Sequence, residues 1–274
     1  MDSWKQLISS QRIVVKVGSS TLSYPNGRLN YQKVVKLVET IAEIQKTGKR
    51  IILVSSGAIA VGSGRLGVSS QPPDISDKQT LAAVGQAELI RIYRRFFEAK
   101  GQQVGQVLLT KDVVINPERR MNAHNTLNEL ISMNIIPIIN ENDTVATDEI
   151  EFGDNDTLSA YVACLANTDL LILLSDIDGL YTADPGLNPG AQLISEVCEI
   201  TDKLENYASG AGSGLGTGGM VTKISAARIC QEAGIKVVIA NGSKPEIIWS
   251  ILSGKESGTL FTWKDNNNIY QKNH

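Results

Sequence analysis

The chain has 274 residues, of which 42% are hydrophobic and 20% are charged, and its formal net charge is -3. This length and composition can bury a large core, and they fit either one large domain or two smaller ones. The negative charge and the lack of a basic run argue against a nucleic-acid surface, and no apolar run approaches the roughly 18 residues that span a bilayer.

Short β-branched runs alternate with helical patterns along the chain. The β-branched runs predict buried parallel strands at 12–18, 50–57, 102–110, 135–140, 169–176 and 236–241. Helical spacing or composition predicts helices at 31–46, 76–100, 122–133, 154–166 and 219–233. No proline-rich or charge-rich linker divides the chain. We therefore expect one α/β domain over residues 1–274, with helices layered around a mainly parallel sheet.

Lys16 lies inside the apolar run of the first predicted strand, and the small residues of 18–21 follow it. A buried lysine costs free energy unless its ammonium group is paired, and a phosphate or a carboxylate would be a suitable partner. The alternative is a lysine on an edge strand, with its stem along the apolar surface and its charge in water.

The second predicted strand ends in two hydroxyl groups and a glycine, Ser55-Ser56-Gly57. Glycine lets a ligand approach the backbone, so this turn indicates an anion-binding site. A nucleophilic Ser56 would require a histidine, yet the chain has only His124 and His274, and the latter lies in the polar tail. We therefore expect Ser56 to bind a substrate, and we assign no chemistry to His124.

Polar residues follow the fourth predicted strand at 140–144, and they recur in the run FGDNDT at 152–157, which opens a helix. Asp154 is typical of a helix N-cap. A helix N-terminus beside a strand end also favours an anionic substrate. Within this cluster Asp143 suits an ammonium group, and Asp156 suits the orientation of a lysine.

The fifth predicted strand runs into Ser175 and Asp176 and then into the pattern D-x-D-G at 176–179. This pattern indicates a calcium loop only when more ligands follow. The glutamate of the EF-hand pattern is missing here, so we do not expect calcium.

The segment 210–223 reads GAGSGLGTGGMVTK and precedes a predicted helix. Glycine-rich backbone, the helix N-terminus and the charge of Lys223 would together surround a phosphate. The segment does not match G-x-x-x-x-G-K-[ST], and no strand precedes its G-x-G-x-x-G, so a Rossmann fingerprint is not expected. The alternative is a flexible glycine linker.

The three cysteines, Cys164, Cys198 and Cys230, are odd in number and far apart. Each lies in an apolar or helical context, which predicts reduced core thiols rather than disulfides or metal ligands. The start of the chain lacks the pattern of a secretory signal. We expect a soluble cytoplasmic protein.

Six motifs in this order resemble the amino acid kinase family: VVKVGSS, VSSGAIAVG, NENDTV, FGDNDTLSA, LLSDIDGLYTADP and GTGGMVTK. The resemblance covers about residues 12–261, and it points to the members that phosphorylate the γ-carboxylate of L-glutamate. It implies an open αβα sandwich and ATP as co-substrate together with Mg²⁺. The implied products are L-glutamyl 5-phosphate and ADP, in the first step of proline biosynthesis.

The resemblance also implies roles for single residues. It places Lys16 and Lys223 on the transferring phosphoryl group and makes Asp156 the residue that organises both lysines. It assigns the binding of glutamate to Ser56, Asn140, Asp143 and Asn155. It assigns the ATP site to Lys16, Ser175, Asp176, Thr217, Gly218, Gly219, Met220 and Lys223.

The same resemblance implies inhibition by proline, through a loop at about 116–125, and a homodimer or homotetramer. The sequence stops soon after Phe261, so we expect no C-terminal PUA domain. Two alternatives stay open. One is a family member that acts on N-acetylglutamate, aspartate, carbamate or UMP, and the other is a nucleotide-binding regulator that retains the fold without turnover.

Overall fold

The computed structural model describes residues 2–24, 28–68, 74–146, 152–202, 204, 207 and 219–263. Its described strands form an eight-stranded sheet in the order β3-β4-β2-β1-β5-β7-β8-β6. Six strands pair in parallel, namely β1 (Arg12–Val17), β2 (Arg50–Ser55), β3 (Val104–Leu109), β4 (Ile136–Glu141), β5 (Leu170–Ser175) and β7 (Lys236–Asn241). The short β8 (Thr259–Phe261) is antiparallel to β7 and parallel to β6 (Glu196–Val197).

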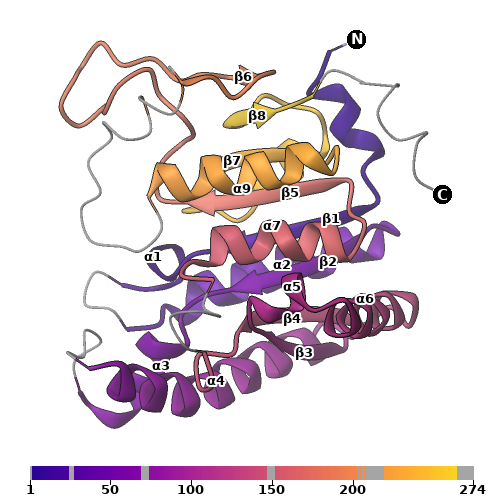
Figure 1. Cartoon of the computed structure of the whole chain (residues 1–274), viewed down its shortest axis with the longest axis vertical. Helices are drawn as coiled ribbons and strands as arrows, with labels where there is room; N and C mark the ends of the chain where they lie inside the picture. Colours follow the sequence, from indigo (N-terminus) through magenta and orange to yellow (C-terminus); the bar gives the residue numbers. More distant parts are fainter. Residues whose placement is uncertain are drawn as a thin grey trace.

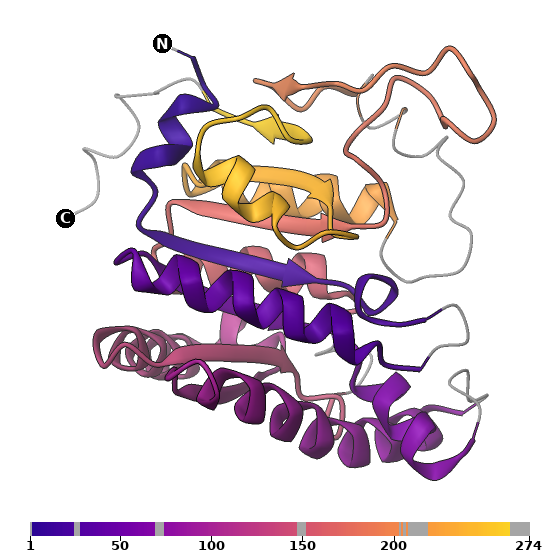
Figure 2. The ribbon, with the colours of Figure 1, turned by 180° about the vertical axis from the view of Figure 1, so that it is seen from behind.

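Helices cover both faces of the sheet, as Figures 1 and 2 show. One face carries α6 (Pro117–Ser132), α7 (Asn155–Leu165) and α9 (Met220–Glu232), and α7 and α9 lie side by side in Figure 1. The opposite face carries η1 (Lys5–Ser9), α2 (Tyr31–Lys46), α4 (Ile75–Glu98) and α10 (Ile247–Leu252). Three short helices lie in connections, α1 (Ser19–Leu22), α3 (Ala58–Leu66) and α5 (Asp112–Ile115). The predicted α/β sandwich with a mainly parallel sheet is confirmed.

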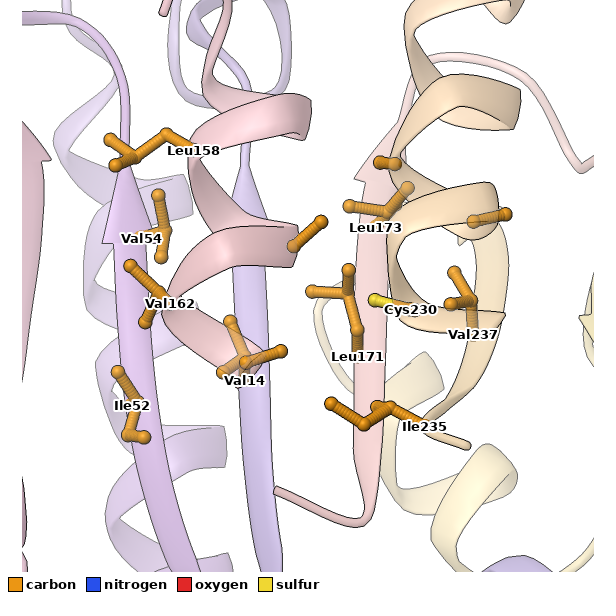
Figure 3. Packing of buried hydrophobic residues seen from close by; sticks show 14 of the residues in the cluster. Val14, Ile52, Val54, Leu158, Val162, Leu171, Leu173, Cys230, Ile235 and Val237 are labelled. Carbon is orange, nitrogen blue, oxygen red and sulfur yellow. The ribbon is translucent and has the colours of Figure 1, made fainter. Parts of the chain in front are cut away.

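Alternation along each strand sends successive side chains to opposite faces. In β1, Val14 and Lys16 lie on the face covered by α7 and α9, whereas Ile13 and Val15 pack on the side of α2. Figure 3 shows Val14 and its neighbours packed between the sheet and these helices, with the Cys230 thiol among them. The core is thus split by the sheet into two layers.

Two expectations are wrong in detail. Strand β3 lies at the edge of the sheet, and only its Leu109 is buried, because one side of the strand has no neighbouring strand. The segment 116–125, expected as a loop, belongs almost wholly to α6. Its N-cap Asn116 accepts a hydrogen bond from the Arg119 backbone at 3.1 Å, and Pro117 supplies a pre-set φ at the first helical position.

The prediction that the three cysteines are core thiols is wrong in part. Cys230 is buried, Cys164 is half-buried and Cys198 is exposed. Burial raises the pKa of Cys230 and of Cys164 above the usual thiol range. No described helix is long and apolar enough to cross a membrane.

Candidate active site

Lys16, Asp156 and Lys223 form a buried cluster although they come from β1, α7 and α9. The Lys16 Nζ atom lies 2.6 Å from Asp156 Oδ1, and the Lys223 Nζ atom lies 3.0 Å from Asp156 Oδ2. The Asp156 side chain is fully buried, and the lysine side chains are 7% and 5% exposed. The structure thus excludes the edge-strand alternative for Lys16, since β1 lies between β2 and β5.

Electrostatics keeps the Asp156 carboxylate ionised. Burial alone would raise the pKa of Asp156, but the charges of Lys16 and Lys223 outweigh it and hold that pKa below its usual value. One carboxylate and two ammonium groups give these three buried side chains a formal net charge of +1. Such a positive site attracts an anion with several oxygens.

Gly18 lies beside this positive charge. A Cβ atom at that position would lie 3.6 Å from the Lys16 Nζ atom. Lacking that atom, the turn after β1 lets a ligand approach the ammonium group.

The first turn of α9 adds a hydroxyl group that the sequence reasoning missed. The Thr222 Oγ1 atom lies 2.8 Å from Asp156 Oδ2 and 2.7 Å from the Gly219 carbonyl oxygen, so its single hydrogen can be donated to either acceptor. Gly219 is the N-cap of α9 and Met220 its first residue, so the end of the glycine-rich segment lies at the carboxylate. Thr217 and Gly218 lie outside the described residues. The Thr-Lys pair at 222–223 was the available signal for Thr222.

The N-cap of α7 holds Asn155 and Asp156 in place. Asp154 accepts hydrogen bonds from the Thr157 backbone at 2.7 Å and from the Thr157 hydroxyl at 2.9 Å. The prediction of Asp154 as a cap is confirmed, and such a cap stabilises a helix by about 1 kcal/mol. The cap therefore fixes the backbone from which the Asn155 and Asp156 side chains extend.

Three of the predicted glutamate-binding residues are joined by hydrogen bonds. The Asn155 Nδ2 atom donates to Ser56 Oγ at 2.6 Å and to Asn140 Oδ1 at 2.9 Å. The Asn140 Nδ2 atom in turn donates to Gln86 Oε1 at 2.9 Å. Gln86 belongs to α4, and the sequence reasoning missed it because it lies 54 residues before Asn140.

Asp143, the fourth predicted glutamate-binding residue, is placed by a cavity and not by the hydrogen bonds that join the other three. It lies just after β4 and lines a cavity together with Gln86, Gln106 and Thr144. This position is next to the hydrogen-bonded chain that starts at Gln86.

The predicted nucleotide-binding residues Ser175 and Asp176 lie at the end of β5. In the sheet, β1 separates this strand from β2. The buried Ser175 ends β5 and donates to the exposed Asp176 carboxylate at 3.1 Å. Nearby, Asn241 at the end of β7 donates to Asp178 at 2.8 Å. The carboxyl ends of β5 and β7 therefore offer polar groups beside the turn that Ser175 begins, where ligands bind in open α/β sheets.

His124 has a structural role in α6. Its Nδ1 atom lies 2.7 Å from the Leu165 carbonyl, at the far end of α7 from Asp156. The structure thus agrees with leaving His124 out of the chemistry.

The chain belongs to the amino acid kinase family, whose model matches residues 11–241. Within that family it is similar to a glutamate 5-kinase of Listeria monocytogenes serotype 4b (strain CLIP80459), with 48% identity over 274 residues, 98% of this chain and 99% of that relative. It is also similar to a glutamate 5-kinase of Clostridium perfringens (strain 13 / Type A), with 50% identity over 264 residues, 95% of this chain and 98% of the relative.

Solved structures share the fold at lower identity. Carbamate kinase from Giardia lamblia bound to AMP-PNP matches with a TM-score of 0.68 and 16% identity, over 94% of this chain and all of that one. UMP kinase from Ureaplasma parvum matches with a TM-score of 0.62 and 18% identity, over 92% and 98% of the two chains. At such identities the likeness concerns the fold alone.

Proposed function

We propose that this protein is a glutamate 5-kinase. It transfers the γ-phosphoryl group of ATP to the γ-carboxylate of L-glutamate, which gives L-glutamyl 5-phosphate and ADP in the first step of proline biosynthesis. The supporting observation is the buried pair of lysines around Asp156, in a chain about half identical to glutamate 5-kinases along nearly its whole length.

This reaction fits residues that include no catalytic histidine. A carboxylate with a pKa of about 4.3 is already ionised at neutral pH, so it attacks phosphorus without a general base. The barrier then lies in aligning two anions and in neutralising the charge on the phosphoryl oxygens. Lys16 and Lys223 supply positive charge, and Asp156 keeps both ammonium groups in place before the substrates bind.

The two halves of the site take the two substrates in this proposal. L-Glutamate binds to Ser56, Asn140, Asp143 and Asn155, near the ends of β2 and β4. ATP binds near Ser175, Asp176, Gly219 and Met220, with Thr217 and Gly218 from the glycine-rich segment. Membership of the amino acid kinase family and the likeness to glutamate 5-kinases support ATP as the phosphoryl donor.

Magnesium is part of the proposal only as the partner of ATP. Among the described residues, no group of three histidine, cysteine, aspartate or glutamate side chains could hold a metal ion. Mg²⁺ commonly binds through substrate phosphates and water with one or two protein carboxylates, so it needs no such cage. Bound to ATP, it would neutralise phosphate charge.

Inhibition by proline, assembly into a homodimer or homotetramer and a cytoplasmic location complete the proposal. They rest on the resemblance to the family and to the glutamate-specific members within it.

The test is ADP release with Mg-ATP and, in parallel, L-glutamate, N-acetyl-L-glutamate and L-aspartate, with hydroxylamine present to trap an acyl phosphate. We expect the hydroxamate from L-glutamate alone. Turnover of another acceptor would assign the chain to a different reaction of the family. ATP binding without turnover of any acceptor would indicate a regulator.

A further inference from the structure

Helix α4 contacts the amino-acid half of the site from behind. In β4, Ile136 and Ile138 pack on the layer that contains α2 and α4, so Asn140, two residues further, turns to the same side. There its Nδ2 atom meets Gln86 Oε1 at 2.9 Å. Gln86 is half-buried, and it lies behind Asn140 rather than in the chain from Asn155 to Ser56.

Each amide of this chain fixes the orientation of the next. Because Gln86 accepts from Asn140 Nδ2, the Oδ1 atom of Asn140 is directed to Asn155. Asn155 then has to present its Nδ2 group, and both hydrogens of that group are used, one on Asn140 and one on Ser56. A flipped Asn140 would set two NH₂ groups against each other and leave Gln86 Oε1 without its donor, which costs about 1–3 kcal/mol.

The chain of amides determines what the pocket offers to a substrate. The Ser56 Oγ atom accepts from Asn155, so its own hydrogen is available for donation to an acceptor. In the described part of the chain the Asn155 Oδ1 atom takes part in no hydrogen bond, so it is available to accept from a donor. A donor and an acceptor side by side are complementary to the carboxylate and ammonium groups of an α-amino acid.

We propose that Gln86 is a positioning residue that sets the hydrogen-bond polarity of the amino-acid pocket. Through Asn140 it makes Ser56 a donor to the α-carboxylate and Asn155 an acceptor for the α-ammonium group. The inference rests on the proposed function and deepens it, since it assigns the recognition of a free α-amino acid to a residue that need not touch the substrate.

Two further contacts fix the position of α4 relative to the site, a hydrogen bond and a close approach to α3. Tyr93, two turns after Gln86, lies with its hydroxyl 2.8 Å from Ser55 Oγ, and Ser55 donates to the Ser56 carbonyl at 3.0 Å. A Cβ atom at Gly85 would lie 1.7 Å from the Ala58 carbonyl oxygen, so α3 and α4 approach closely only because this residue is glycine. The Gln86 side chain thus starts from a rigid backbone.

Steady-state kinetics of Gln86→Met tests the proposal, because methionine keeps the length of the side chain and removes the acceptor. We expect the KM for L-glutamate to rise about tenfold, which is the loss of one net hydrogen bond, with kcat changed less than about twofold and the KM for ATP unchanged. Gln86→Glu keeps an acceptor oxygen and should stay within about threefold of the wild-type KM.

The matched control is Gln32→Met. Gln32 is exposed in the first turn of α2, so the same chemical change there should leave both KM values unaltered. Equal effects of Gln86→Met and Gln32→Met, or a Gln86→Glu variant as impaired as Gln86→Met, would overturn the proposal.

Competition between L-glutamate and glutarate, which lacks the α-ammonium group, supplies a readout that is independent of the amount of folded enzyme. The ratio of kcat/KM for L-glutamate to that for glutarate should fall about tenfold in Gln86→Met. An unchanged ratio would refute the role of Gln86, while the wild-type enzyme still confirms the reaction. A wild-type enzyme that turns over neither acid would instead refute the proposed function, and this inference with it.

Discussion

The substitution Asp156→Asn removes the negative charge that holds two buried lysines. The carboxylate oxygens lie 2.6 Å from Lys16 Nζ and 3.0 Å from Lys223 Nζ. At an effective dielectric constant of about 20, each pair of unit charges about 3 Å apart attracts by roughly 5–6 kcal/mol. Desolvation cancels much of this attraction, and loss of one member of a buried ion pair costs about 3–5 kcal/mol. We expect the free energy of unfolding without nucleotide to fall by that amount.

Such a loss corresponds to a decrease in Tm of about 6–20 °C for a chain of this size. Binding of Mg-ATP should then raise the Tm of Asp156→Asn by more than it raises the wild-type Tm, because phosphate replaces the missing charge between the lysines. The same variant should lose a factor on the order of 10² or more in kcat, since its lysines are no longer aligned on the phosphoryl group.

Thermal unfolding of both proteins, with and without Mg-ATP, measures these effects. The matched control is Asp77→Asn, which removes the same charge at an exposed position in the first turn of α4 and should cost less than about 1 kcal/mol. A Tm of Asp156→Asn equal to that of the control, or no larger gain from ATP than in the wild type, would refute the reasoning.

The difference in unfolding free energy between the wild type and Asp156→Asn should depend on pH in one direction. The folded-state pKa of Asp156 is lowered from a usual value of 3.8, so its stabilising contribution is fully present above that value. The contribution is lost as the pH falls through the folded-state pKa. The gap in unfolding free energy between the wild type and Asp156→Asn should therefore be constant near neutral pH and narrow in acid.

Further predictions concern single side chains. Lys16→Ala and Lys223→Ala should each lower kcat by a factor on the order of 10² or more with little change in the KM for glutamate, and near-normal turnover would remove that lysine from the mechanism. Asp143→Ala should raise the KM for glutamate far more than it lowers kcat, whereas an effect confined to ATP would contradict its placement in the amino-acid pocket. At neutral pH a maleimide should label the exposed Cys198 in the native protein and label Cys230 only after unfolding, as measured by mass spectrometry of peptides.

The sequence predicted the six long parallel strands because their apolar runs are continuous and bounded by turn residues. It did not predict β6 and β8, which have two and three residues and gain their strand conformation by pairing at the edge of the sheet. It also missed α3. The glycines in AIAVGSGRL argue against a helix, but contact with α4 through Gly62 and Gly85 overrides their low propensity.

The ion pairs that Asp156 forms with Lys16 and Lys223 could be predicted in part. A lysine in a buried strand and a lysine at a helix start both require a counter-charge, and the family resemblance supplied the pairing. The contacts of Thr222 and Gln86 did not follow from this reasoning, although the Thr-Lys pair at 222–223 marked Thr222 as a candidate. Their roles depend on which side of a helix faces a strand end, and that is decided by packing between segments more than 50 residues apart.

The first turn of α7 links the two halves of the site. Consecutive residues of an α-helix point about 100° apart, so Asn155 reaches Asn140 of β4 while Asp156 reaches Lys16 of β1 and Lys223 of α9. The Asp154 cap fixes both at once. A displacement of this single turn would misalign the amino-acid pocket and the phosphoryl site together. For the proposed transfer between two anions, this arrangement ties the position of the attacking carboxylate to the position of the charges that neutralise the phosphoryl group.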